Sequence, residues 1–557
     1  MGKPLIVQGD NTILLDVHDP DADEARIAIS PFTELEKSPE HFHVYRISPL
    51  SIWNACSAGL DAARMLADME SFSRFPVPGN VRTGLEELAG RYGRLRLEAT
   101  EDPYVLELVV PDSQVRAELE NRPAVGALLG HTGQEDRYTV SLIHRGTLKQ
   151  QLIHLGYPVD DTAPLSEGDP VTFHLRNETR GGHPFEVRGY QKEAAAVFHG
   201  GGRPGAGYGT VVLPCGAGKT VVGMAVMELL HTSTLILTTN IAAVHQWIDE
   251  LLDKTDLTED QIGEYSGTRK EVRPVTIATY QVLVWRPDRE AAFPHFDIFR
   301  QRRWGLIIYD EVHLLPAPVF RITAEIQAIR RLGLTATLVR EDRREADVFS
   351  LVGPKRYDVP WKELESKGWI AEAACFEIRL DLPTSLRTNY AIADARSKFR
   401  IASENEKKIE AAAQIVENHR QEAVMVIGQY LDQLKALAER LQAPLITGKV
   451  PNARREEIYR DFREGRSPVI VVSKVANFAI DLPDASVAIQ VSGSFGSRQE
   501  EAQRLGRILR PKKGAHRNST FYTLISNQTV EETFAANRQK FLTEQGYSYH
   551  IEHWQDL

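Results

Sequence analysis

Short apolar runs that alternate with stretches of helical spacing occur in two series along the chain. The first series has runs at residues 211–213, 235–237, 275–277, 306–308 and 332–334, and the second at 424–427, 445–446, 469–472, 487–489 and 521–525. Strands that alternate with helices form parallel sheets covered by helices on both faces. The pattern therefore predicts an α/β protein with two doubly wound parallel-sheet domains in tandem. Functional groups are then expected at the carboxyl ends of the strands.

The first 178 residues follow other patterns. Strand-like runs at 5–7 and 13–15 are followed by helical spacing from Leu50 to Met69, and alternation from Tyr92 onward includes one helical piece near 115–129. Residues 178–185 carry the glycines and proline of a linker. We therefore expect small α+β domains before the two sheet domains, with boundaries at 1–90, 91–178, 179–368 and 369–557.

Composition limits the class of protein without identifying it. The 557 residues are 42% hydrophobic and 25% charged, which is ordinary for a soluble protein. The net charge of −10 gives no overall attraction to a polyanion, so a nucleic-acid partner would need local basic or backbone-amide contacts. The three scattered cysteines favour a reducing compartment without disulfides or metal clusters. Without an apolar run of about 18 residues, we expect a cytoplasmic protein.

The sequence PCGAGKT at 214–220 lies between an apolar run and a helical stretch. Glycines at a helix start let backbone amides approach phosphates, and a following Lys-Thr adds a cation and a magnesium ligand. The stricter phosphate-loop pattern would have a glycine in place of Leu213, so only the short GxGKT form is met. An ordinary glycine turn is the alternative. The nucleotide contacts we expect are Gly216, Ala217, Gly218, Lys219 and Thr220.

An acidic pair follows the apolar run at 306–308. Asp310 is positioned to hold magnesium, Glu311 to polarise the attacking water, and His313 to sense the γ-phosphate. The alternative is a pair of acids that caps a helix. The hydroxyls of Thr335 and Thr337 come after the next apolar run, where they could pass the state of the phosphate to a strand-binding surface.

Arg188 and Gln191 stand in the sequence RGYQ, a few tens of residues before the glycine loop. A glutamine beside an aromatic residue at this place could pair with the edge of adenine, although a surface helix start would use the same residues. We therefore predict an adenine contact at Arg188 and Gln191.

A second set of phosphate contacts is expected from the second sheet domain. Gln503, Arg507 and Arg510 lie on an apparent helix, where residues three apart share one face. Guanidinium groups supplied to a γ-phosphate act as arginine fingers, whereas a solvated basic helix is the alternative.

The order of these motifs is that of superfamily 2 helicases, and further segments closely resemble the XPB family of DNA repair helicases. The resemblance covers roughly residues 180–550 and rests on DEVH at 310–313, the segments 334–342, 353–355 and 472–474, DLP at 481–483, the segments 503–514, 538–542 and 545–548. It implies two RecA-like helicase domains that use ATP and Mg²⁺ to move 3′ to 5′ on DNA and open a duplex or fork, with a damage-recognition-like domain at 91–178. It also implies a bacterial-type member with a possible nuclease or other repair partner.

The resemblance also assigns roles to particular residues. Arg340, Glu341 and Asp342 match an element thought to help wedge the duplex apart, and Asp481 is the acid kept where the general helicase pattern is otherwise changed. Matched positions for contacts to the DNA strand are Thr239, Asn240, Gln246, Gly267, Thr279, Gln429, Thr447, Ser473 and Lys474. Trp247 could stack on a base or belong to the core.

Two other functions use the same motifs. The protein could be a superfamily 2 motor that acts on RNA, or that moves on duplex DNA without unwinding it. It could also be a scaffold in which bound ATP only locks a conformation. The intact Glu311 and the paired arginines argue against the scaffold.

Overall fold

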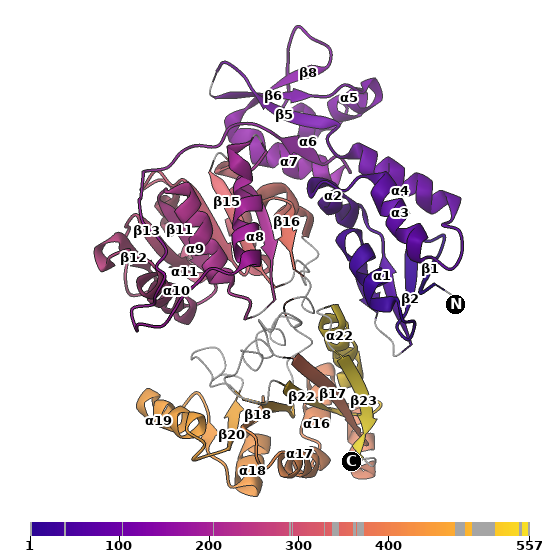
Figure 1. Cartoon of the computed structure of the whole chain (residues 1–557), viewed down its shortest axis with the longest axis vertical. Coiled ribbons are helices and arrows are strands. Elements are labelled where there is room, and N and C mark those ends of the chain that lie inside the picture. Colours follow the sequence, from indigo (N-terminus) through magenta and orange to yellow (C-terminus); the bar gives the residue numbers. More distant parts are fainter. Residues whose placement is uncertain are drawn as a thin grey trace. The chain divides into compact units, whose positions relative to one another are not determined.

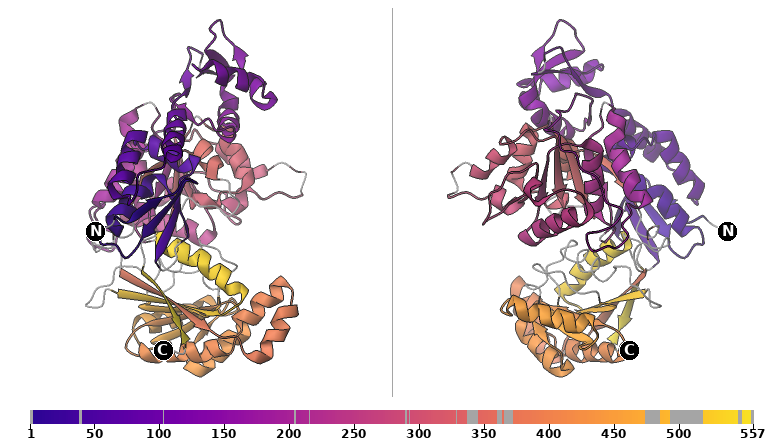
Figure 2. Two further views of the ribbon diagram at one scale, coloured as in Figure 1. Left: turned by 90° about the vertical axis from the view of Figure 1, so that its right-hand side faces the viewer. Right: turned by 60° about the vertical axis from the view of Figure 1, so that its left-hand side comes forward.

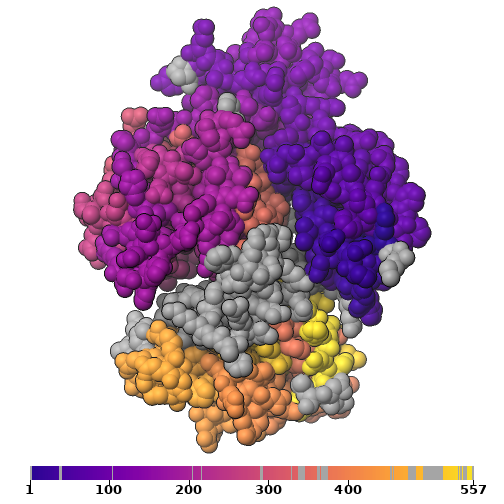
Figure 3. Space-filling model, in the orientation of Figure 1, coloured from indigo at the N-terminus to yellow at the C-terminus, as the bar shows by residue number. Residues whose placement is uncertain are grey.

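The computed structural model describes residues 3–37, 41–102, 104–203, 205–214, 216–288, 291, 293–327, 329–336, 345–359, 364, 372–473, 485–492, 518–544 and 548–554 (Figure 1). The chain divides into two compact units, one made of Met1–Leu213 with Gly218–Val359 and the other of Pro214–Ala217 with Pro360–Leu557. Each unit contains one large parallel sheet, and the first unit also contains two smaller sheets. Figure 3 shows the side chains of the described residues from one face, coloured along the sequence.

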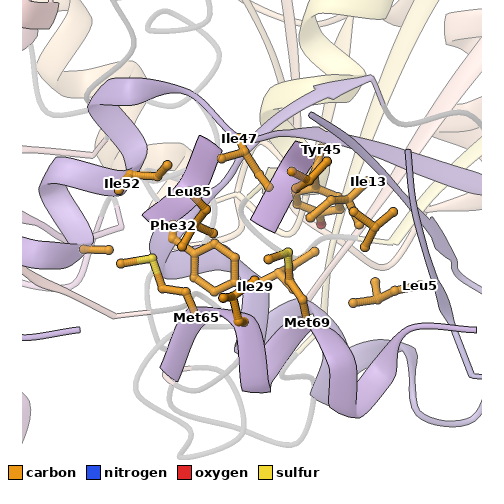
Figure 4. Packing of buried hydrophobic residues seen from close by; sticks show 14 of the residues in the cluster. Leu5, Ile13, Ile29, Phe32, Tyr45, Ile47, Ile52, Met65, Met69 and Leu85 are labelled. Atoms are coloured by element: carbon orange, nitrogen blue, oxygen red, sulfur yellow. The ribbon is translucent and has the colours of Figure 1, made fainter. Parts of the chain in front are cut away.

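The first small sheet is antiparallel, with strand order β1-β2-β4-β3. Its strands are β1 (Leu5–Val7), β2 (Thr12–Asp16), β3 (Glu34–Lys37) and β4 (Phe42–Arg46), and the helices are α1 (Ala22–Ile29), α2 (Pro49–Ser57), α3 (Ala62–Phe72) and α4 (Gly79–Arg91). Ser48 and Asp61 accept hydrogen bonds from the first turns of α2 and α3 and so define where these helices begin. Phe32, Met65 and Met69 pack in the apolar core (Figure 4). The predicted strands and helical spacing are present.

The second small sheet has the order β7-β8-β6-β5-β9. It contains β5 (Leu95–Ala99), β6 (Val105–Val109), β7 (Gly130–His131), β8 (Arg137–Ser141) and β9 (Val159–Asp161), with helices α5 (Ser113–Glu120), α6 (Pro123–Gly126) and α7 (Arg145–His154). The single helical piece expected near 115–129 is wrong, because the chain forms two helices there. A residue before proline avoids the helical region, and Arg122 before Pro123 is extended, with ψ 107°.

The large sheet of the first unit is parallel throughout, with order β12-β13-β11-β14-β15-β10-β16. Figure 2 shows the ribbon from two further sides. Its strands are β10 (Tyr208–Val212), β11 (Thr234–Thr238), β12 (Ile262–Tyr265), β13 (Val275–Thr279), β14 (Leu306–Asp310), β15 (Arg330–Thr335) and β16 (Lys355–Asp358). The helices that connect or cover them include α8 (Gly189–His199), α9 (Lys219–Leu230), α10 (Ile241–Lys254), α11 (Tyr280–Leu283) and α12 (Ala317–Glu325).

Both faces of this sheet are buried, which explains the continuous apolar runs in its strands. Leu235 and Ile307 belong to the apolar cluster that includes residues of α11 and α12. Ile308, whose side chain points to the opposite face, lies close to Gly223 of α9 and Trp247 of α10. A Cβ atom at Gly223 would be 2.7 Å from the Trp247 ring, so glycine allows the two helices to pack closely.

The large sheet of the second unit is also parallel, with order β19-β20-β18-β21-β22-β17-β23. Its strands are β17 (Glu372–Leu380), β18 (Val424–Gly428), β19 (Leu445–Ile446), β20 (Val469–Ser473), β21 (Val487–Gln490), β22 (Asn518–Ser526) and β23 (Ser548–His553). The described helices include α15 (Thr384–Ile392), α16 (Ala395–Ser403), α17 (Lys407–Asn418), α18 (Leu431–Leu441), α19 (Asn452–Arg463) and α22 (Val530–Glu544). The predicted fold class, two parallel-sheet domains after an α+β region, is confirmed.

A buried cluster of charges connects the second small sheet to the large sheet of the first unit. The carboxylate of Asp161, at the end of β9, accepts from Arg145 Nε (3.0 Å) and Nη2 (2.8 Å) and from Lys149 Nζ (2.8 Å). Lys149 Nζ also donates to Gln327 Oε1 at 3.1 Å. Burial alone would raise the pKa of Asp161, but Lys149 and Arg145 together outweigh it and hold that pKa well below its usual range.

Tyr208, the first residue of β10, joins the same cluster. Its hydroxyl donates to the backbone carbonyl of Asp161 at 2.9 Å. Lys149, Arg331 and Arg356 lie over its ring, with the charged groups 5.0, 5.4 and 5.2 Å from the ring centroid. The cluster therefore fixes the start of the strand that runs into the glycine loop.

Candidate nucleotide site

The glycine loop leaves the carboxyl end of β10 and opens helix α9. The backbone N–H of Leu213 donates to the carbonyl of Thr335 at 2.9 Å, and Gly216 and Gly218 have φ angles of 81° and 78°. Only glycine adopts this left-handed region without strain. A Cβ atom at Gly218 would also lie 2.5 Å from Gln191 Nε2. The loop therefore requires glycine for both its backbone conformation and its packing.

Side chains that follow or end three strands form a line of contacts beside this loop. Lys219 Nζ lies 3.6 Å from Glu311 Oε1, and Glu311 Oε2 lies 3.6 Å from His313 Nδ1. The same His313 nitrogen is 2.7 Å from the hydroxyl of Thr335. These contacts join the residues after β10, β14 and β15, as expected where parallel strands end at one edge. The sequence-predicted residues Lys219, Glu311, His313 and Thr335 are thus brought together.

Asp310 is the last residue of β14 and, like Glu311, is half-buried. Its carboxylate accepts from Trp247 Nε1 (2.9 Å) and from the backbone N–H of Glu311 (3.0 Å), and its carbonyl accepts from the Tyr280 hydroxyl (3.0 Å). Burial, and then the charge of Glu311, raises the pKa of Asp310 to about 6. The two donors fix the orientation of a carboxylate whose charged form is costly at this depth.

Glu311 has an unusual backbone. Its φ and ψ angles are 50° and 54°, in the left-handed region that residues with a Cβ rarely enter. Such conformations cost of order 1–3 kcal/mol and persist where the surrounding structure requires them. Here the turn directs the Glu311 carboxylate toward Lys219 and His313 instead of continuing β14.

Gln191 lies at a helix start, which was the alternative to the adenine contact; the adenine contact itself stays a prediction. Gln191 Oε1 accepts from the backbone N–H of Arg188 at 2.9 Å, which caps the start of α8, while its amide nitrogen lies beside Gly218. Arg188 Nη1 in turn donates to the Tyr190 hydroxyl at 3.3 Å. The helix start therefore holds the Gln191 amide against the glycine loop.

The donor set fits a nucleoside triphosphate with a divalent cation. The first turn of α9, a helix of 12 residues, presents backbone N–H groups with Lys219 and Thr220 beside them. A carboxylate and a hydroxyl oxygen, from Asp310 and Thr220, are the ligand types that Mg²⁺ prefers. The ion pair of Lys219 with Glu311 places a cation next to a base at the same loop.

The residues proposed to contact a nucleic-acid strand lie after the carboxyl ends of strands. Thr239 and Asn240 follow β11, Gly267 follows β12 and Thr279 ends β13, while in the second unit Gln429, Thr447 and Ser473 follow or end β18, β19 and β20. Several already have structural partners: Asn240 and Thr279 cap α10 and α11, and the N–H of Gln429 donates to Ser492 Oγ at 2.7 Å. Gln246 and Gly267 are exposed.

Other predicted site residues lie outside the described residues. They are Thr337, Arg340, Glu341, Asp342, Lys474, Asp481, Gln503, Arg507 and Arg510.

Two residues of the site were not assigned their role from the sequence. Trp247 is 2% exposed and donates to Asp310, so of its two possible roles the structure supports the core position. Its spacing from Val244 and Leu251, both buried on α10, is the sequence signal for that position. Tyr280, whose hydroxyl donates to the Asp310 carbonyl, carried no such signal because the contact joins the start of α11 to the end of β14, 30 residues later in the chain.

In the part of the chain that the structure describes, no helix combines the length and apolar character needed to cross a membrane.

Comparison with known proteins shows similarity to helicases in family models and in individual relatives. Residues 364–555 match the ERCC3/RAD25/XPB C-terminal helicase family, residues 184–340 match the type III restriction enzyme res subunit, and residues 5–133 match a helicase conserved C-terminal domain. The chain is 51% identical to a protein of Kineococcus radiotolerans and 49% identical to one of Mycobacterium tuberculosis, both named DNA 3'-5' helicase XPB. These alignments cover 100% of the chain and 97% and 98% of the two relatives. A putative DNA 3'-5' helicase Rad25 of Halobacterium salinarum is 38% identical over 82% of the chain and 72% of that protein.

Proposed function

The chain belongs to the XPB family of helicases, and we propose that it hydrolyses ATP to move 3′ to 5′ along DNA and to open duplex DNA during repair. The observation that carries the proposal is the line of contacts from Lys219 through Glu311 and His313 to Thr335. These contacts bring a cation, a carboxylate, an imidazole and a hydroxyl to one glycine loop, which supports a site where ATP turnover is coupled to movement.

Each residue of this line has a distinct task in the proposed reaction. Lys219 and the N–H groups at the start of α9 hold the β- and γ-phosphates. Glu311 orients the attacking water and accepts its proton, for which its carboxylate must be released from Lys219 when the phosphates take over that cation. Mg²⁺, held at Asp310 and Thr220, would neutralise charge on the phosphate oxygens.

Trp247 and Tyr280 keep Asp310 in place for this task. One donates to its carboxylate and the other to its carbonyl, so the end of β14 is held from α10 and from α11. Because catalytic geometry must hold within about 0.5 Å, these contacts position the carboxylate before any ligand arrives.

His313 connects the phosphate site to β15. It bonds Thr335, whose carbonyl accepts from Leu213 just before the glycine loop. A displacement of Glu311 would therefore change the position of His313 and, through it, of Thr335 at the end of β15. In the sequence, Thr335 precedes the proposed duplex-wedging residues Arg340, Glu341 and Asp342.

The remaining contacts are proposed on the family pattern. Gln503, Arg507 and Arg510 would supply arginine fingers, and Asp481 would contribute to nucleotide binding. The polar residues after the strand ends would hold DNA phosphates without reading the sequence, as a motor requires. We also propose a cytoplasmic location, and a nuclease or other repair protein as partner.

Strand displacement on duplexes with a 3′ or a 5′ single-stranded tail tests the proposal. Wild-type protein with ATP and Mg²⁺ is expected to open the 3′-tailed duplex, whereas Glu311→Gln keeps ATP binding and loses about 10²- to 10⁴-fold in turnover. Glu439→Gln, at an exposed position on α18, is the control and should match wild type. Opening of the 5′-tailed duplex alone, or ATP turnover stimulated by RNA and not by DNA, would contradict the proposal.

A further inference from the structure

Trp285 is an exposed indole at the outer part of the first parallel sheet. It follows α11 by two residues, and 54% of its surface is exposed to solvent. In that part of the sheet β12 is the edge strand and β13 its neighbour. An exposed tryptophan loses apolar burial, so its surroundings decide whether it has a binding role.

Two further rings anchor the indole to the core. The Trp285 and His295 ring centroids are 5.8 Å apart with planes tilted by 51°, and His295 packs edge-on against Tyr265 at 5.7 Å. His295 Nδ1 also lies 2.9 Å from the Tyr265 hydroxyl. Tyr265 is buried at the end of β12, within the apolar cluster of the sheet. The exposed indole of Trp285 is therefore connected through His295 to the buried ring of Tyr265.

Two cationic side chains, Lys270 and Arg286, lie near these rings. Lys270 Nζ lies 4.9 Å from the Tyr265 ring centroid and donates to the carbonyl of Ser266. The guanidinium of Arg286, the residue after Trp285, lies 5.0 Å from the centroid of Phe293. Of the nearby acids, the Asp297 carboxylate accepts from Gln301 and the Asp288 carboxylate from the N–H of Ala291. Exposed aromatic and cationic groups are thus combined at one place.

The cluster adjoins positions already proposed to hold the DNA backbone. Gly267 lies in the turn two residues after Tyr265, and a Cβ atom there would meet open space. Thr279 caps α11, the short helix that ends just before Trp285. Because β12 and β13 are parallel, these residues and the rings come together at the carboxyl edge of the sheet.

We propose that Trp285, supported by His295 and Tyr265 and flanked by Lys270 and Arg286, stacks against a base of single-stranded DNA. The inference rests on the proposed function and adds to it the way in which the strand is held at the outer end of this edge. Stacking on an aromatic face tolerates any base, and neighbouring cations attract the phosphates, so the site suits a motor that moves over every sequence. A protein surface would fit the exposed indole but would not need the two cations.

Binding of fluorescent oligo(dT) to the full-length protein, measured by anisotropy at fixed salt, tests the proposal. Trp285→Ala is expected to weaken binding by between about 5-fold and 150-fold, the range for loss of one base–aromatic stack. Trp285→Phe, which keeps an aromatic face, should recover most of the affinity. Phe75→Ala removes an aromatic side chain that is 58% exposed in the N-terminal sheet domain and should bind as wild type does.

Photo-crosslinking gives a second readout that does not depend on affinity. Oligonucleotides with single 5-iodouracil substitutions should crosslink to the peptide that contains Trp285, and mass spectrometry should locate the link. The thermal midpoint and the ATPase rate without DNA should be unchanged in Trp285→Ala.

The two proposals fail in different ways. If Trp285→Ala binds and crosslinks like wild type while DNA still stimulates ATP turnover, the stacking site is overturned and the motor function stands; the exposed indole then serves a protein contact or none. If wild-type protein neither binds DNA nor is stimulated by it, the proposed function itself is overturned.

Discussion

The buried carboxylate of Asp161 allows a direct test of how the first unit is held together. Asp161→Ala would remove the partner of two cations, because Arg145 and Lys149 both bond this one carboxylate at 2.8 Å. All three side chains are almost completely buried. The two cations could not regain water without disrupting the packing of α7.

The expected cost follows from this burial. Removing one partner of a buried ion pair typically destabilises a protein by about 3–5 kcal/mol, because it leaves charge that is buried and unpaired. For a unit of several hundred residues, 1 kcal/mol corresponds to roughly 1–2 °C in the thermal midpoint. Asp161→Ala should therefore lower the midpoint of the first unit by about 3–10 °C.

Differential scanning fluorimetry, with hydrogen exchange to locate the effect, is the assay. Exchange should accelerate in α7, β9 and the start of β10, where Tyr208 bonds the Asp161 carbonyl. The control is Asp68→Ala, which breaks an exposed pair with Arg64 and should cost about 0–1 kcal/mol. Replacing Asp161, Arg145 and Lys149 together by Leu, Met and Met should restore most of the stability. Equal midpoints for Asp161→Ala and Asp68→Ala would refute the reasoning.

Two other predictions concern Trp247, which holds Asp310, and Lys149, which holds Asp161. Trp247→Phe removes the N–H that holds Asp310 and should lower ATP turnover by about 10- to 150-fold, because hydrogen bonds to charged groups contribute about 1.5–3 kcal/mol. The matched control is Trp53→Phe, because the Trp53 N–H donates to a backbone carbonyl away from the site. Equal steady-state rates for the two variants would contradict the prediction. Burial lowers the pKa of Lys149 to about 8, whereas an unfolded lysine titrates near 10.4. Between these pH values the unfolded chain binds more protons than the folded chain, so the stability contributed by Lys149 increases with pH, by at most about 1.4 kcal/mol per pH unit. The thermal midpoint of wild type should therefore rise relative to that of Lys149→Met between pH 7.5 and 9.5. Parallel curves for the two proteins would show that Lys149 is not titrating.

The sequence was most informative where one strand and the residue after it carry the pattern. The apolar runs of β10, β11, β14 and β18 are continuous because both faces of each sheet are covered. Continuous apolar runs of this kind could be recognised as strands from the sequence. β17 and β23 were not predicted, since charged residues such as Glu377 interrupt their apolar pattern. Arg122–Pro123 shows the opposite error, in which a helical pattern hid a break imposed by the backbone.

The sequence by itself determined which chemical groups follow which strands: glycines and Lys219 after one, Asp310 and Glu311 at the end of another. Strand order and parallel pairing put these ends on one edge, so the local pattern was sufficient to predict what meets there. Only the tertiary structure decided which groups hold the site from outside, such as Trp247 on Asp310 and Arg145 and Lys149 on Asp161. Such contacts join positions far apart in the chain, and they depend on burial and side-chain packing that no spacing along a sequence encodes.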